Sequence, residues 1–108
     1  MKKVMISNGL RGKPNPNNYR ASCIAAVHND LKLRGEADTN EVLDTTEVID
    51  TFTGNRIKSL GRSISNELAL ADVVYFMDDW EKYDGCRVEH FVCVTYGVPV
   101  RYLYSGDR

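Results

Sequence analysis

The segment from residue 84 to 90, DGCRVEH, carries the side chains best suited to catalysis. It begins a predicted helix on which one stripe at i, i+3, i+4 and i+7 spacing should face a sheet; its members are Val88, Phe91, Val92 and Thr95. Glu89 sits beside this stripe, just past the first turn, where it can reach a cleft at the sheet edge. The helix dipole favours the ionised glutamate that a nucleophile needs. The alternative is an exposed glutamate without a role, and His90 fits a packing or surface position.

A second candidate is the loop that follows the first apolar run, Ser7-Asn8-Gly9-Leu10-Arg11-Gly12. Gly9 and Gly12 let the backbone approach a ligand closely, and the Arg11 guanidinium offers a fork of donors suited to phosphate. We therefore expect the backbone from Ser7 to Gly12, Asn8 included, to bind an anion together with Arg11. The alternative is a flexible turn with a solvated arginine, because the pattern is neither a Walker loop nor a complete GxGxxG.

A third candidate follows the strongest strand pattern, at residues 78–85. Asp78 and Asp79 stand at a carboxyl end where acidic side chains can bind sugar hydroxyls, and Trp80 can stack on a base. The end of the loop adds further candidate contacts at Tyr83, Asp84 and Gly85. The alternative is an ordinary loop in which one aspartate caps a turn.

Length and charge exclude several classes of protein. The 108 residues have room for one domain, spanning 1–108. With a net charge of -1, the chain lacks the excess of basic residues that is typical of a duplex-binding protein. No apolar run approaches the roughly 20 residues of a membrane helix, and Met1-Lys2-Lys3 leads into a strand, not a signal peptide.

Cysteine usage indicates a cytoplasmic setting without a metal. Cys23, Cys86 and Cys93 are odd in number and form no CxxC pair, which suggests buried thiols in a reducing compartment. His28 and His90 lack zinc-ligand spacing with them, so we expect neither a metal nor a cofactor.

The elements that position these candidates alternate strand and helix. Strands are predicted over 3–7, 41–45, 72–77 and 98–104, and helices over 19–34, 57–71 and 85–96. Asn17 or Asn18 can cap the first helix and Gly35 ends it. The apolar stripes are Ile24, Val27, His28 and Leu31 on the first helix and Ile57, Leu60, Ile64 and Leu68 on the second. This order predicts a flavodoxin-like α/β domain with a four-stranded parallel sheet of order 2-1-3-4, whose ligand binds at the carboxyl edge between the first and third strands.

Three segments in this order resemble the nucleoside 2-deoxyribosyltransferase superfamily. The first loop resembles the phosphate-binding turn of the deoxynucleoside 5-monophosphate N-glycosidases. The run Leu70-Ala71-Asp72-Val73-Val74-Tyr75 resembles the family's entrance to a strand. The run from Trp80 to Pro99 resembles the nucleophile helix and the strand after it, and the closest match is a short branch found in bacteria and their phages.

The resemblance implies that Glu89 attacks the anomeric carbon of a deoxyribosyl group and that Arg11 holds a 5-phosphate. It also implies a homodimer or larger homo-oligomer. Two positions depart from the family pattern: Tyr83 stands where the family has Ser or Asp, and Ile64 stands where it often has a second catalytic Asp.

Three functions remain open at this stage. The first is an N-glycosidase or deoxyribosyltransferase with Glu89 as nucleophile, which Glu89 itself favours. The second is a non-catalytic binder that sequesters a nucleotide or nucleotide-derived signal, for example in phage counter-defence, which Ile64 favours. The third is a purely structural module, which explains the long loop over 8–18 poorly.

Overall fold

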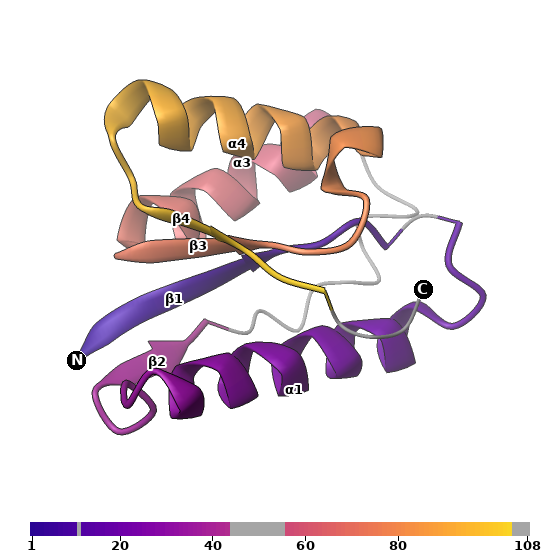
Figure 1. Ribbon diagram of the computed structural model, residues 1–108. Coiled ribbons are helices and arrows are strands. Elements are labelled where there is room, and N and C mark those ends of the chain that lie inside the picture. Colours follow the sequence, from indigo (N-terminus) through magenta and orange to yellow (C-terminus); the bar gives the residue numbers. More distant parts are fainter. Residues whose placement is uncertain (11, 44–55, 105–108) are drawn as a thin grey trace.

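Four parallel strands form the central sheet (Figure 1). The computed structural model describes residues 1–10, 12–43 and 56–104. The strands are β1 (Lys2–Ser7), β2 (Asn40–Val42), β3 (Val73–Phe76) and β4 (Val100–Tyr102). Their order is β2-β1-β3-β4, and every neighbouring pair is parallel. The predicted order 2-1-3-4 is therefore confirmed.

Within the described residues, three α-helices cover the sheet from both sides (Figure 1). They are α1 (Pro16–Leu33), α3 (Arg56–Asn66) and α4 (Asp84–Tyr96). Helix α1 lies below the sheet in this view, whereas α3 and α4 lie above it. Two 3-10 turns, Leu68–Leu70 and Trp80–Lys82, lead into β3 and α4. This three-layer arrangement is the flavodoxin-like fold that the alternation of strands and helices predicted.

The pleat of β1 divides its side chains between the two layers. Val4 and Ile6 belong to the core beneath α1, whereas Met5 belongs to the core beneath α3 and α4. Alternation then turns Ser7, the last residue of the strand, toward the α4 side. A strand buried on both faces thus ends with a hydroxyl at the carboxyl edge of the sheet, where Ser7 is 2% exposed.

Helix α1 begins earlier than its sequence pattern indicated. Its cap is Asn15, whose Oδ1 accepts a hydrogen bond of 3.1 Å from the Asn18 amide, so the predicted caps Asn17 and Asn18 were wrong. Pro16 occupies the first turn, where its missing N–H costs nothing. The helix closes before Gly35, whose φ of +72° favours glycine, as predicted. The buried residues of the helix are Tyr19, Arg20, Cys23, Val27 and Leu31. The predicted stripe was therefore wrong at His28, which is exposed, whereas Ile24 is partly buried.

The second predicted helix and two strands are shorter than their patterns. Helix α3 ends at Asn66 instead of continuing to residue 71, because the next residues tighten into a 3-10 turn. Ile57, predicted to lie on the buried stripe, is 81% exposed. Strand β2 stops at Val42, and residues 44 and 45 of the predicted strand lie outside the described residues. Strand β4 keeps only three residues of the seven predicted.

Two further findings concern the thiols and the helices of the described residues. Cys23, Cys86 and Cys93 are all buried and free. No helix within residues 1–10, 12–43 and 56–104 is long and apolar enough to cross a membrane.

Candidate functional site

Glu89 lies in a polar contact between three elements of the fold. The side chain is 6% exposed. Its Oε1 accepts a hydrogen bond of 2.7 Å from the Ser7 hydroxyl at the end of β1. Its Oε2 accepts one of 2.5 Å from the Ser63 hydroxyl on α3. Both carboxylate oxygens are therefore held in place at the carboxyl end of β1, beside the topological switch point between β1 and β3.

This contact fixes how α4 is rotated, and the rotation differs from the prediction. The buried residues of the helix are Cys86, Glu89 and Cys93. Val92 packs partly against the core, but Val88 and Phe91 are 40% and 69% exposed, and Thr95 is exposed. The prediction that this stripe faces the sheet was wrong. Apolar residues occur on both sides of α4, and the two hydroxyls that bind Glu89 turn its side of the helix inward.

Burial sets the electrostatics of Glu89. Desolvation raises the pKa of its carboxyl group above the ordinary value, and the nearby charge of Glu67 raises it further. The hydrogen bonds from Ser63 and Ser7 and the charge of Arg20 act against this and lower the pKa. Burial therefore opposes the ionised form of Glu89 that the helix dipole was expected to favour.

Three residues near Glu89 were not among the predicted contacts. Ser63 donates to it, and Glu67 and Arg20 are buried with exposed fractions of 6% and 8%. Arg20 donates to the Ile6 carbonyl at 3.4 Å and to Asn8 Oδ1 at 3.0 Å, which ties α1 to the first loop. A signal existed for Arg20, because it stands in register with the buried stripe that continues at Cys23 and Val27. Ser63 lies on α3, and Glu67 follows the end of that helix, with its amide donating to the Ser63 carbonyl at 3.1 Å.

The first loop and the segment before α4 meet at Gly9. The ring of Tyr83 lies over this glycine so closely that a Cβ placed there would come within 2.1 Å of the ring. Two segments that the sequence separates by more than 70 residues are thus brought together, as the site hypothesis requires. Gly12 has φ +81° and no neighbour within 4 Å of a Cβ position. Arg11, the predicted phosphate ligand, lies outside the described residues.

Asp78 is engaged on the α1 side of the sheet. It is 1% exposed, and its Oδ2 accepts a hydrogen bond of 2.9 Å from the Tyr19 hydroxyl. Desolvation raises the pKa of that hydroxyl, and the bond to Asp78 raises it further, so Tyr19 keeps its proton as the donor. Asp78 therefore joins the end of β3 to α1, and a role in binding sugar hydroxyls stays a prediction.

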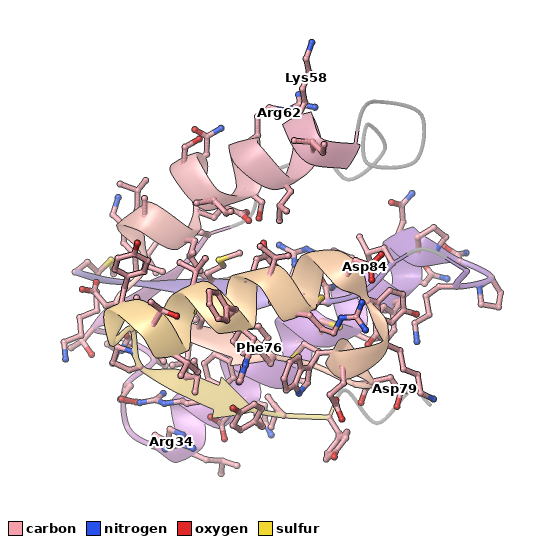
Figure 2. All side chains as sticks on the ribbon, turned by 90° about the horizontal axis from the view of Figure 1, so that it is seen from above. Arg34, Lys58, Arg62, Phe76, Asp79 and Asp84 are labelled. Atoms are coloured by element: carbon pink, nitrogen blue, oxygen red, sulfur yellow. The ribbon has the colours of Figure 1, made fainter. Side chains whose placement is uncertain are left out.

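Trp80 belongs to an aromatic cluster at the carboxyl ends of β3 and β4. Its ring stacks on His90 with 4.1 Å between centroids and lies 5.3 Å from Phe76. His90 in turn lies 2.6 Å from the Tyr102 hydroxyl, through Nε2. Beside this cluster is a cavity of about 130 Å³, lined by Phe76, Met77, Asp79, Trp80, Glu81, Tyr102, Leu103 and Tyr104. Figure 2 shows Phe76 under α4 and Asp79 in the turn before it.

The first turn of α4 is open. Asp84 is an exposed residue that pairs with Arg87 one turn further on. Gly85 has nothing within 4 Å of a Cβ position, and Tyr83 makes no side-chain capping bond to the helix. The amides at this end therefore remain suited to an anion, as helix N-termini are. Figure 2 shows Asp84 at this end of α4.

Neither a metal-binding cluster nor a similarity to known proteins identifies the function of this site. Among the described residues, no group of three or more His, Cys, Asp and Glu side chains could hold a metal ion. Comparison of the chain with protein-family models, curated proteins and solved structures gives no match. The proposed activity therefore depends on the geometry around Glu89 and on the motifs of the sequence.

Proposed function

We propose that the protein cleaves or transfers the N-glycosidic bond of a nucleoside or nucleotide with Glu89 as the nucleophile. The observation that carries the proposal is the carboxylate of Glu89, which receives one hydroxyl on each oxygen at the carboxyl edge of β1. Nucleophilic carboxylates of retaining glycosidases must be held in one orientation against the anomeric carbon. Ser7 and Ser63 supply that orientation from two separate elements.

The proposed reaction has two steps. An oxygen of Glu89 bonds to the anomeric carbon while the bond from that carbon to the base nitrogen breaks. The nitrogen keeps the electron pair and takes up a proton. Water then attacks the same carbon, releases the carboxylate and gives up a proton, so the sum is hydrolysis. A second base in place of water gives transfer.

Other elements at the carboxyl edge of the sheet suit the remaining parts of a nucleotide. The open first turn of α4 offers amides for a phosphate. The cavity next to Trp80 offers an aromatic wall on which a planar base can stack. Asn8 and Gly9 bring the first loop to the same edge of the sheet, where a sugar would lie between base and phosphate.

A second candidate function is binding without turnover. Two observations favour it: burial raises the pKa of Glu89, and Ile64, in the family's acid position, packs partly against the apolar core. A protonated Glu89 would line a binding site without attacking the ligand. The two functions share the site and differ only in base release.

The experiment compares base release and binding in the same set of proteins. We expect wild type to release free base from one member of a panel of nucleosides and 5-monophosphates, measured by chromatography. Glu89→Gln should lower the rate at least 10³-fold because it removes the nucleophile. Glu41→Gln, the same change at an exposed position of β2, is the matched control and should keep full activity.

Binding measured by calorimetry separates the two candidates. Tight binding of a monophosphate by wild type, with no base released, favours the binder. Base release that persists unchanged in Glu89→Gln rules out Glu89 as nucleophile, whatever the affinity.

A further inference from the structure

The cavity beside Trp80 is built from aromatic rings and acidic side chains. Of the eight described residues that line it, Asp79 and Glu81 carry carboxylates and none carries a positive charge. Its aromatic rings are those of Phe76, Trp80, Tyr102 and Tyr104. Tyr102 and Tyr104 are 57% and 62% exposed, so a ligand can enter from solvent. A cavity of this composition attracts a cation, because ring faces and carboxylates both stabilise positive charge.

The aromatic wall is ordered before a ligand arrives. The Trp80 ring stacks on His90, and its plane lies 28° from that of Tyr102 with 6.0 Å between the two centroids. The Tyr102 hydroxyl lies 2.6 Å from His90 Nε2. Because these contacts already hold the side chains in place, a stacked ligand loses little binding energy to ordering them.

One basic side chain lies near the acidic part of the cavity. Lys82 Nζ is 4.0 Å from Asp79 Oδ1, and the two side chains are 77% and 47% exposed. An exposed ion pair at this distance is weak. Asp79 therefore keeps most of its attraction for a cation in the cavity, and Glu81 adds a second carboxylate.

We propose that the base held in this cavity is positively charged, as a purine alkylated at N7 is at neutral pH. The inference rests on the proposed function, because it names the class of base bound at that site. A cationic ring stacks on the aromatic wall and is also attracted by Asp79 and Glu81, whereas a neutral base gains only the stacking. The cavity therefore distinguishes two bases of nearly equal shape by their charge.

A cationic base also simplifies the reaction at Glu89. As an oxygen of Glu89 bonds to the anomeric carbon, the bond from that carbon to the base nitrogen breaks, and its electron pair neutralises the ring. The base leaves uncharged without taking up a proton, and water then releases the sugar and the carboxylate with loss of one proton. The groups that donate to Glu89 are the hydroxyls of Ser7 and Ser63, which are much weaker acids than the imidazolium or carboxyl groups that protonate leaving groups. A base that needs no proton fits these surroundings.

Tryptophan fluorescence tests the preference for charge, because Trp80 is the only tryptophan of the chain. Titration with 7-methylguanosine 5-monophosphate should quench the signal at a concentration about tenfold lower than guanosine 5-monophosphate requires. The 7-deaza-7-methyl analogue has the shape of the methylated nucleotide without its charge and should bind like the unmethylated one. The double variant Asp79→Asn, Glu81→Gln should lose the preference, whereas Glu41→Gln, at an exposed position of β2, should keep it.

Several results of this titration overturn the inference. They are equal affinity for the methylated and unmethylated nucleotides, equal affinity for the methylated nucleotide and its neutral analogue, a preference that survives the double variant, and no quenching by any of the three nucleotides.

Base release, measured by chromatography, separates this inference from the proposed function. We expect 7-methylguanine to appear faster than guanine from the matching ribose and deoxyribose nucleotides, after correction for spontaneous loss, and Glu89→Gln should abolish the difference from the spontaneous rate. Preferential binding of the methylated nucleotide without release supports the charged base and overturns cleavage. Release from neutral nucleotides that is equally fast and depends on Glu89 supports cleavage and overturns the charged base.

Discussion

The two sides of α4 reverse the usual relation between polarity and burial. The inner side holds an acidic residue, Glu89, at 6% exposure, while the outer side shows Phe91 at 69%. The inner acid is stable there because Ser7 and Ser63 donate to both of its oxygens. The Phe91 ring on the outer side remains largely exposed. Polarity alone therefore does not tell which side of this helix is the interior; the available hydrogen-bond donors do.

An aspartate placed on each side should give the largest contrast. Cys93, on the inner side of α4, is 0% exposed. Burial together with the charge of Glu89 raises the pKa of its thiol to about 11. A second negative charge buried beside Glu89 has no partner there, so Cys93→Asp should lower the free energy of unfolding by about 3–5 kcal/mol. The neighbouring change Val94→Asp, on the outer side, should cost about 0.5 kcal/mol.

Urea unfolding followed by circular dichroism measures both changes. The protein concentration should be low, because any association of copies would add its own stability. Similar midpoints for Cys93→Asp and Val94→Asp would falsify the assignment of inner and outer sides.

The inner side continues into the contact between Tyr83 and Gly9, which gives the next largest effect. Gly9→Ala forces the Tyr83 ring away and should cost about 1–3 kcal/mol. The control is Gly61→Ala on α3, where nothing lies within 4 Å and the helix should gain about 0.5–1 kcal/mol. The same urea experiment measures both, and opposite signs are expected. A neutral Gly9→Ala would mean that Tyr83 does not hold the first loop.

The pH dependence of stability tests the burial of the Glu89 carboxyl group. Its pKa is raised in the folded protein, so the folded state keeps the proton in a window where the unfolded chain has lost it. Stability therefore falls as pH rises from about 4.3, the unfolded value, through the raised folded pKa, by about 1.4 kcal/mol for each unit between them. Glu89→Gln should remove this loss.

Unfolding curves at a series of pH values from 4 to 8 test the linkage. Wild type should become less stable relative to Glu89→Gln as pH rises, whereas Glu41→Gln should track wild type. Parallel profiles for wild type and Glu89→Gln would show that burial does not penalise the ionised glutamate.

Much of the fold could be predicted because it depends on local pattern and chain order. Alternating strands and helices, together with right-handed crossovers, leave few sheet orders, and β2-β1-β3-β4 is one of them. The end of α1 followed from Gly35. The ends of α3 and of the short strands did not, because a 3-10 turn and edge pairing depend on tertiary contacts.

The site was only partly predictable, because it too depends on tertiary contacts. Glu89 stood out by type and position, and Tyr83 and Gly9 do meet. Its hydroxyl donor Ser63 lies on another helix, and a contact across elements leaves no periodic signal. The rotation of α4 could not be predicted either, because apolar residues at Val88 and Phe91 are typical of a buried stripe.

The three buried thiols allow the two helical layers to be followed separately in time. Cys23 lies on the buried side of α1, whereas Cys86 and Cys93 lie on the buried side of α4. A thiol reagent reaches such a group only when its layer opens, so its modification rate measures the frequency of that opening. Chains that keep one thiol each would show whether α4 detaches while α1 stays packed. Any ligand that stabilises the packing of α4 on the sheet would slow the modification of Cys86 and Cys93 and leave that of Cys23 unchanged.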